Sequence, residues 1–401
     1  MTEERWSDTD LLSHIVDFIS EYSIRSENPF SLLPGSVRKL ELKASIVVTE
    51  KNLTEAHLLT PRLTAVLPDA LSQFTPSLIH GNCSMTIKKR HEVGNLTVLL
   101  LDYCKYYGIN RIVDVGCGVG HLVSQLSRHC KVVGIDCNED FCQRARKSCA
   151  YAEIICLTIT CDGAEDQNLS KFLSGDEYDR TAVVSLHGCG DLQPALLRYF
   201  CKLDRNRVPL IFTIPCCYHK MLNLEKEVFH WIMSDEIKRR SISCEVLPVS
   251  ALRLACQKHI YNWPSSDRER EKHTNNFINR ALLECLYDKR KDLPPFTCRK
   301  LNCNFGDLRG TGAKLASQLG MDENGVSQID QLYRAIYTEQ ESYFAYIEPF
   351  TLLQTMMQIP LEFFILLDRL FFLREHGCSA HLLSIFNPKV SSRHLCLIGS
   401  R

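Results

Sequence analysis

The feature that most constrains the fold is a glycine-rich turn, Asp114-Val115-Gly116-Cys117-Gly118-Val119-Gly120, in which a short apolar strand runs into a helix. The strand is predicted at 111–115 and the helix at 122–128. Glycines at such a turn let the backbone approach a ligand closely, and the N-terminus of the following helix offers free N–H groups. The turn therefore predicts a ligand at the carboxyl end of the strand.

The spacing of the glycines indicates which cofactor binds. A dinucleotide site requires G-x-G-x-x-G, but here the third glycine falls at position 120 and position 121 is His. A Walker A loop is excluded, because no Gly-Lys-Ser/Thr follows. The pattern D-x-G-x-G-x-G is instead typical of Rossmann-like methyltransferases that use S-adenosylmethionine (SAM). We therefore predict SAM as the cofactor, bound through Asp114, Gly116, Gly118 and Gly120.

Two further acids fit the same cofactor. Asp136 ends the next predicted strand, 131–135, where a carboxylate can accept hydrogen bonds from both ribose hydroxyls. Asp162 follows the third predicted strand, 153–160, where it can accept from the adenine amino group. Both are predicted to contact SAM.

The remaining pattern predicts an α/β fold. Further strands are predicted at 181–186 and 208–214, and helices at 140–150 and 193–203 separate the earlier ones, which favours parallel βαβ units. A helix predicted at 360–375 ends before Gly377, and two strands at 380–386 and 394–398 form a hairpin. We expect a Rossmann-like, mostly parallel sheet closed by this C-terminal antiparallel hairpin. The expected organisation is a helical N-terminal region (1–84), the SAM-binding core (85–220), a helical, partly basic insertion (221–345), and a C-terminal helix and hairpin that complete the core (346–401).

Two motifs follow the fourth and fifth strands, which are expected to be neighbours: His187-Gly188-Cys189-Gly190-Asp191 and Pro215-Cys216-Cys217-Tyr218-His219. Ligands in such sheets lie beyond the carboxyl ends of the strands, so these side chains could converge beside the transferred methyl group. They could pack structurally, orient or deprotonate the acceptor, or bind zinc, although their spacing is not a familiar zinc pattern. We assign catalysis to His187, Asp191, Cys216 and Cys217, and no metal.

Charge and composition limit the partners. Lys plus Arg equals Asp plus Glu at 47 each, so a general polyelectrolyte binder is excluded and no DNA partner is expected. Residues 268–300 nevertheless hold nine Lys/Arg against five acids, and Tyr261, Trp263 and Phe296 could stack on RNA bases. The alternative for this segment is a solvated charged face. Nothing in the sequence indicates a protein partner.

The cysteines and the apolar runs bear on the cellular compartment of the protein and on membrane insertion. The 20 cysteines are scattered, and 1–20 has no uninterrupted apolar stretch of the kind a secretory leader needs. We expect reduced thiols and a cytosolic or nuclear protein. The most apolar run, 359–373, carries Glu362, Asp368 and Arg369 and is shorter than the roughly 20 residues of a membrane span, so no span is predicted.

Several stretches together resemble a known family. They are KKRHEV (88–93), VDVGCGVGHL (113–122), LHGCGDL (186–192), PCCYHK (215–220) and ILLDRLFFLREHG (365–377). They resemble the methyltransferase-like protein 25 family, which includes the ribosomal RNA adenine dimethylase domain-containing protein. A wider kinship includes tRNA 2′-O-methyltransferases that act on the acceptor stem.

The resemblance implies a class I SAM-dependent methyltransferase with RNA as the favoured substrate. It implies no acceptor atom, because the chain lacks the Asn/Asp-Pro-Pro-Tyr/Phe motif of adenine amino-group methyltransferases. The alternatives are a protein or small-molecule acceptor, or a SAM-binding pseudoenzyme that serves as an interaction partner.

Overall fold

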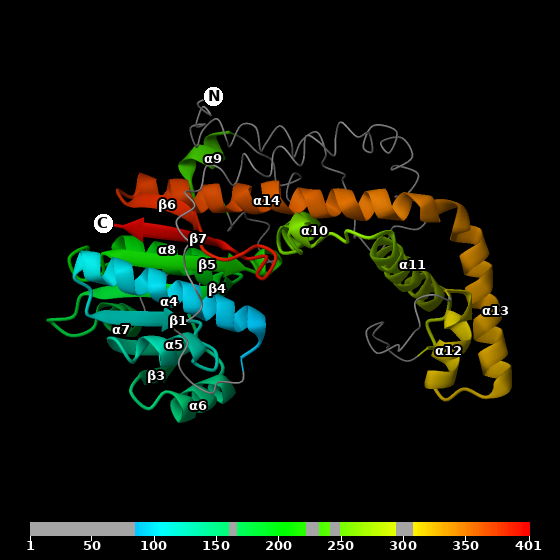
Figure 1. Cartoon of the computed structure of the whole chain (residues 1–401), viewed down its shortest axis with the longest axis horizontal. Coiled ribbons are helices and arrows are strands. Elements are labelled where there is room, and N and C mark those ends of the chain that lie inside the picture. The colour runs from blue at the N-terminus through cyan, green and yellow to red at the C-terminus, as the bar shows by residue number, and fades with distance from the viewer. Residues whose placement is uncertain (1–84, 160–166, 222–231, 241–248, 294–307) are drawn as a thin grey trace. The chain divides into compact units, whose positions relative to one another are not determined.

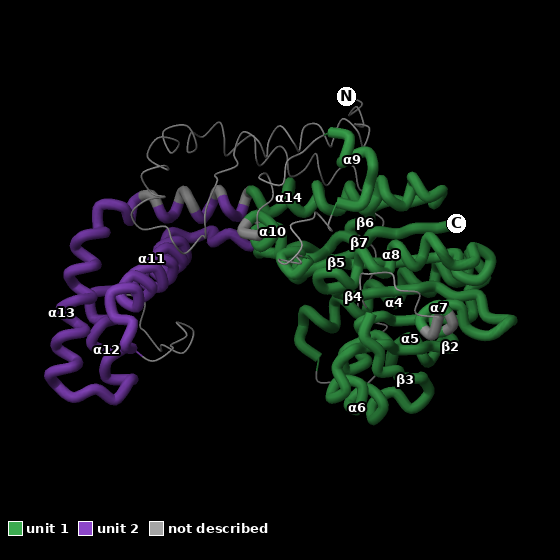
Figure 2. The backbone as a smooth tube through the Cα atoms, turned by 180° about the vertical axis from the view of Figure 1, so that it is seen from behind, with its two compact units in different colours: residues 1–23, 59–261, 357–401 green, residues 24–58, 262–356 purple. Residues whose placement is uncertain are grey.

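A computed structural model describes the chain over five ranges, 85–159, 167–221, 232–240, 249–293 and 308–401. The helical region predicted at 1–84 lies outside these residues. The described residues form two compact units (Figure 2). The sheet unit comprises described residues of 85–261 and 357–401, and the helical unit comprises those of 262–356.

The sheet unit is built on one sheet of seven strands in the order β3-β2-β1-β4-β5-β7-β6 (Figure 1). Neighbours among the first five strands are parallel, whereas β7 runs antiparallel to both β5 and β6. The predicted mostly parallel sheet with a C-terminal hairpin is therefore confirmed. The strands are β1 (Arg111–Val115), β2 (Lys131–Asp136), β3 (Glu153–Cys156), β4 (Thr181–Cys189), β5 (Leu210–Cys216), β6 (Ser379–Ser384) and β7 (Leu395–Ser400).

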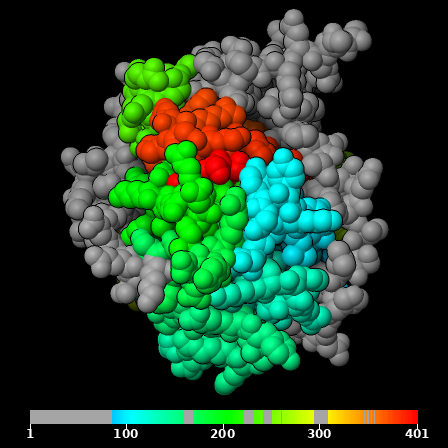
Figure 3. Space-filling model, turned by 90° about the vertical axis from the view of Figure 1, so that its left-hand side faces the viewer, coloured from blue at the N-terminus to red at the C-terminus, as the bar shows by residue number. Residues whose placement is uncertain are grey.

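Helices cover both faces of the sheet, as expected for parallel strands that are buried on both sides. Buried side chains of α4, α5 and α6 pack on one face. Phe200 of α8 and Leu373 of α14 approach Gly399 of β7 on the other. In Figure 3 the cyan atoms of α4 and the orange atoms of α14 flank the red C-terminal hairpin. The helices of this unit are α4 (Ile87–Tyr107), α5 (His121–Leu126), α6 (Glu139–Ser148), α7 (Gln167–Ser174), α8 (Leu192–Lys202), α9 (Asp235–Arg239), α10 (Val249–Ala255) and the end of α14 (Ile347–Glu375).

Three elements, β4, β5 and α14, have different bounds from those that the sequence pattern predicts. β4 and β5 extend to Cys189 and Cys216, because the motif residues themselves pair across the two strands. The helix expected to begin at Pro360 instead runs from Ile347, with the proline inside it. Proline removes one backbone donor from a helix interior but does not prevent the helix when packing holds both sides. Here the residues that flank Pro360 are buried.

The charges within the apolar run of α14 have buried partners. Glu362 accepts hydrogen bonds from Tyr218 Oη (2.9 Å) and pairs with Arg393 Nη1 (3.0 Å). Asp368 pairs with Arg369 and accepts from the backbone N–H of Ser234 (2.9 Å). The run is thus a core helix with paired charges, as buried charges require. Within the described part of the chain, no helix is both long and apolar enough to cross a membrane.

The compact helical unit begins at 262 and ends at 356, within and just beyond the range of the insertion predicted at 221–345. The described residues just after β5 belong to the sheet unit because buried polar groups hold them there: Asp368 binds Ser234, and Arg393 donates to the carbonyls of Ala255 and Gln257.

The helical unit contains α11 (Asp267–Lys289), α12 (Thr311–Gln318), α13 (Glu323–Gln340) and the first part of α14. Ser266 and Glu269 form a capping box at the start of α11, which satisfies the free N–H groups there. α12 and α13 pack closely because Gly312 has no side chain: a Cβ there would lie 2.6 Å from Tyr333 Cβ. The core of this unit includes Leu282, Leu286, Leu315, Ile329 and Tyr333.

The position of β7 between β5 and β6 makes the hairpin essential for the sheet. A chain truncated after Gly377 lacks β6 and β7, so β5 keeps an unpaired edge and α14 loses apolar partners. We expect this truncation to aggregate, with loss of native far-UV circular dichroism and of SAM binding. A soluble truncation that binds SAM would show that the core ends before β6.

Candidate active site

The glycine turn after β1 is fixed to the neighbouring strand β2. The N–H groups of Gly116 and Cys117 both donate to Ile135 O, at 2.7 and 3.0 Å. Gly116, Gly118 and Gly120 all have positive φ (79°, 56° and 81°), which glycine adopts without strain. The sequence D-x-G-x-G-x-G thus produces a tight turn whose shape is set before any ligand binds.

Gly118 and Gly120 serve different purposes within this turn. A Cβ added at Gly118 would meet nothing within 4 Å, so this glycine borders open space. A Cβ at Gly120 would lie 2.7 Å from Cys149 Sγ and 3.1 Å from Ala145 Cβ, so that glycine allows α5 to pack closely on α6. The room for a cofactor therefore lies at Gly118.

Asp136, at the end of β2, is bonded to the turn. Its Oδ2 accepts from Gly118 N at 2.8 Å, and its Oδ1 accepts from Asn138 N at 2.9 Å. A carboxylate has about four lone-pair directions, so both oxygens can still accept from ribose hydroxyls. The structure brings together Gly118 and Asp136, two of the residues predicted to hold the cofactor.

Asp114, near the end of β1, carries a buried carboxylate. It is 2% exposed, and its Oδ1 has no hydrogen-bond partner among the described residues. Burial raises its pKa to about 7; the charge of Lys89 opposes this shift and that of Asp136 adds to it. A buried acceptor without a partner is costly, and a cation would relieve the cost. The α-ammonium of SAM fits this requirement.

Asp162 lies outside the described residues, so its contact with adenine remains a prediction.

His187 has an unusual backbone at the end of β4. Its φ is 70°, and the register of β4 on β5 shifts between Leu186 and Gly188, so His187 sits in an irregularity of the strand. A positive φ costs energy for a residue with a Cβ. Its Nε2 lies 3.0 Å from Glu92 Oε2, and its side chain is 23% exposed. Among the described residues no hydrogen bond to its Nδ1 is present.

Glu92 of α4 is the functional residue that sequence reasoning missed. It is 1% exposed, and its other oxygen, Oε1, accepts from Ser391 Oγ at 2.7 Å. Burial alone would raise its pKa, but hydrogen bonds from His187 and Ser391 and the charges of His187 and Lys89 lower it to about 2. Glu92 is therefore ionised. The available signal was its position four residues before Leu96 and beside Val93, which are both buried in α4.

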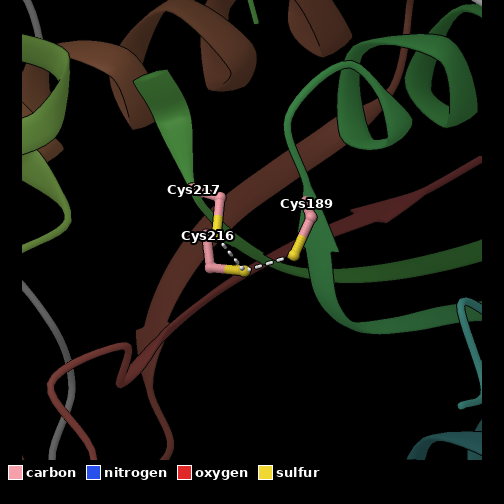
Figure 4. Close-up of side chains that lie close together, drawn as sticks. All are labelled: Cys189, Cys216 and Cys217. Atoms are coloured by element: carbon pink, nitrogen blue, oxygen red, sulfur yellow. Dashed lines mark hydrogen bonds between the residues drawn. The ribbon is translucent and has the colours of Figure 1, made fainter. Parts of the chain in front are cut away.

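Two of the other predicted catalytic residues, Cys216 and Cys217, lie in a separate group together with Cys189. Cys189 Sγ lies 2.9 Å from Cys216 Sγ, and Cys216 Sγ lies 3.7 Å from Cys217 Sγ (Figure 4). Asp191 precedes α8, where it is half-buried and forms no side-chain cap of the helix.

The two histidines of the motifs do not join the cysteines as metal ligands. His187 bonds to Glu92, and His219 Nδ1 lies 3.6 Å from Cys256 Sγ.

Comparison with known proteins identifies the domain. Residues 88–223, which span β1 to β5 and both motifs, match the model of a family described as a methyltransferase domain. That range holds the glycine turn, Asp136 and the buried Asp114. The chain carries a class I SAM-dependent methyltransferase domain.

The methyltransferase domain also has a relative among curated proteins. The mouse (Mus musculus) protein named "Probable methyltransferase-like protein 25" is 25% identical over 243 residues, which cover 56% of this chain and 38% of the mouse protein. The matched region thus spans less than half the length of that relative.

Solved methyltransferase structures resemble the chain only distantly. A SAM-bound amino pentose methyltransferase from Micromonospora echinaspora is 14% identical, with a TM-score of 0.25. The match covers 34% of this chain and 59% of that methyltransferase chain. Coclaurine N-methyltransferase bound to N-methylheliamine and S-adenosylhomocysteine (SAH) is also 14% identical, with a TM-score of 0.23. That match covers 97% of this chain and 100% of the coclaurine N-methyltransferase chain.

The open space at Gly118 yields a prediction with a matched control. Gly118→Ala places a methyl group where the cofactor is expected and forces a left-handed alanine, so we expect SAM affinity to fall at least tenfold and stability to fall by about 1 kcal/mol. Gly108→Ala has the same backbone strain (φ 63°) and the same open surroundings, but lies at the end of α4. It should lose similar stability and keep SAM affinity, measured by calorimetry. Equal SAM affinity in the two variants would contradict the assignment.

The raised pKa of Asp114 predicts how SAM binding depends on pH. The folded pKa, about 7, exceeds the roughly 4 of an unfolded aspartate. Between about pH 4 and pH 7, Asp114 is therefore protonated in the folded chain without SAM but ionised in the unfolded chain. Its contribution to the free energy of unfolding falls as the pH rises through this range. The α-ammonium of SAM pairs with the ionised form of Asp114, so SAM affinity should fall by up to about tenfold per unit as the pH drops below 7. Calorimetric titration of Asp114→Asn should show weaker binding without this dependence.

Proposed function

We propose that this chain transfers a methyl group from SAM to RNA, and that it does so in the cytosol or nucleus, where its thiols stay reduced. The observation that supports the transfer is the buried Asp114 Oδ1, which lacks a hydrogen-bond partner among the described residues, in the same glycine turn as Gly118, where a Cβ would meet no described atom within 4 Å. SAM supplies an electrophilic methyl carbon on its sulfonium. The protein has to hold that carbon in line with an acceptor lone pair, since proximity and orientation supply much of the rate gain.

His187 is the proposed general base. Glu92 holds its Nε2, which leaves Nδ1 to accept the proton that the acceptor loses. Because Glu92 is buried and ionised, it also stabilises the imidazolium that forms, so it acts as a positioning residue for His187. Asp191, Cys216 and Cys217 remain proposed contributors to the acceptor side.

The first turn of α4 supports a polyanionic acceptor. Lys88, Lys89 and Arg90 occupy this turn, which contains no acid. The positive end of the helix dipole disfavours cations there, so three of them cost stability. Lys88 and Lys89 pair with the same carboxylate, that of Glu92, at 3.6 and 3.8 Å, so one acid is shared between two cations. The charge of Lys89 also acts on Asp114. A cationic rim beside the cofactor turn suits phosphate groups.

The basic segment predicted at 268–300 supports RNA less than the sequence suggests. Four of its cations pair with acids, which leaves them less able to bind phosphate: Arg270 with Asp267 and Glu348, Lys289 with Glu339, Arg290 with Asp292, and Lys291 with Asp288. Arg299, Lys300 and Phe296 of this segment lie outside the described residues. The proposal therefore rests on the start of α4.

The test uses tritiated SAM, the full chain and a fractionated cell extract, treated in parallel with RNase and with protease. We expect label that RNase removes and protease does not. His187→Ala should lower transfer by about 10²–10⁴-fold while SAM still binds. Replacing both Lys88 and Arg90 by alanine should weaken RNA binding and reduce the slope of log affinity against log salt by about 1.4 on a single strand.

Lys105→Ala is the matched control, because Lys105 is exposed at the other end of the same helix and should leave both quantities unchanged. Label that protease removes would identify a protein acceptor. Full cellular function in His187→Ala would favour a SAM-binding pseudoenzyme.

A further inference from the structure

Three cysteine thiols converge at the carboxyl ends of β4 and β5. The sulfur atoms of Cys189, Cys216 and Cys217 all lie within 4.8 Å of one another (Figure 4). Cys189 is exposed and the other two are half-buried, so the group is accessible from solvent.

The backbone turns sharply where β5 ends, and this turn brings two of the sulfurs together. Cys217 follows the last residue of β5 and adopts a left-handed conformation (φ 53°). Its sulfur lies 3.7 Å from that of Cys216. Such a conformation costs of order 1 kcal/mol or more for a residue with a Cβ and is typical of functional sites.

A second irregularity brings in Cys189. The register shift between Leu186 and Gly188 places Cys189 directly opposite Cys216 across β4 and β5. An irregularity within β4 and a left-handed residue after β5 therefore both contribute to the position of the thiols.

The chemistry of the cluster suits a soft divalent metal. Cysteine sulfur is a soft ligand, and three such ligands gathered at one point favour zinc over hard cations such as magnesium or calcium. In a tetrahedral site with Zn–S bonds of about 2.3 Å, the sulfurs lie about 3.8 Å apart. The 3.7 Å between Cys216 and Cys217 matches this spacing, and Cys189 has to move away by less than about 1 Å.

We propose that Cys189, Cys216 and Cys217 bind one zinc ion and leave its fourth coordination position open. This goes beyond the proposed methyl transfer and replaces the sequence-based expectation of no metal. Binding displaces the thiol protons to solvent and yields a tris-thiolate zinc complex. Three protein ligands with an open position distinguish catalytic zinc sites from structural ones. The open position takes water or a lone pair of an acceptor.

A disulfide between Cys189 and Cys216 is the competing outcome. Their sulfurs are 2.9 Å apart, against about 2.05 Å in a disulfide, and such a bond would leave Cys217 unused. A disulfide would also not account for the left-handed backbone at Cys217.

The experiment measures the metal content of the full chain, purified without chelators under reducing conditions, by elemental mass spectrometry. We expect about one zinc per chain, released when a mercurial reagent blocks the thiols. Cys189→Ala, Cys216→Ala and Cys217→Ala should each weaken zinc binding by more than about tenfold, since loss of even an outer partner costs that much. Cys189→His, which supplies another zinc ligand, should retain it. Cobalt added to the metal-free chain should give sulfur-to-cobalt charge-transfer absorption.

The matched control is Cys156→Ser. Cys156 is exposed and belongs to a different group of possible ligands, with Glu139 and Cys142, so its replacement should leave the zinc content unchanged. SAM calorimetry on every variant verifies that the fold is intact. The proposal is overturned if the wild type contains no zinc, if copper or iron is bound instead, if Cys156→Ser removes the metal, or if peptide mapping finds the Cys189–Cys216 disulfide in the reduced preparation. Because the readout is metal, the result does not depend on whether RNA is the acceptor.

Discussion

One buried carboxylate, that of Glu92, connects the parts of the site that are most distant in sequence. It lies on α4, binds His187 at the end of β4, and accepts from Ser391 in the connection between β6 and β7. Removing one partner from a buried charge typically costs 3–5 kcal/mol, so the three segments stabilise one another. The positive φ of His187 is held by this arrangement, because its ring is bonded to a group that cannot relax into solvent.

The two halves of the site are built in different ways. The cofactor half consists of neighbouring turns after β1 and β2, which backbone hydrogen bonds to Ile135 and Asp136 hold in place. The proposed acceptor side includes two residues with positive φ, His187 and Cys217, and depends on the contacts of Glu92 with His187 and Ser391, which are far apart in the sequence. Strained residues of this kind are typical of functional sites.

How far the sequence could predict this structure follows from the range of the interactions. β1 was predicted to the residue, because a buried parallel strand is a continuous apolar run and the glycine turn marks its end. The cofactor turn was predictable for the same reason: its pattern is local. The pairing of Glu92 with His187, the shift that places Cys189 opposite Cys216, and the attachment of Ser234 to Asp368 depend on residues far apart in sequence. No periodicity encodes them. Pro360 misled the prediction because tertiary packing outweighed its local preference.

The order of the strands has a consequence for the entropy of the chain. β5 and β6 belong to one sheet, yet about 160 residues, including the whole helical unit, separate Cys216 from Ser379. The cost of closing a loop rises only by about 0.6 kcal/mol for each doubling of its length. Closing this connection of about 160 residues therefore costs only about 2 kcal/mol more free energy than closing a connection of about 20 residues. The sheet tolerates a large module at this point, and such a module can change in size or sequence while the cofactor cradle, formed by earlier strands, keeps its geometry.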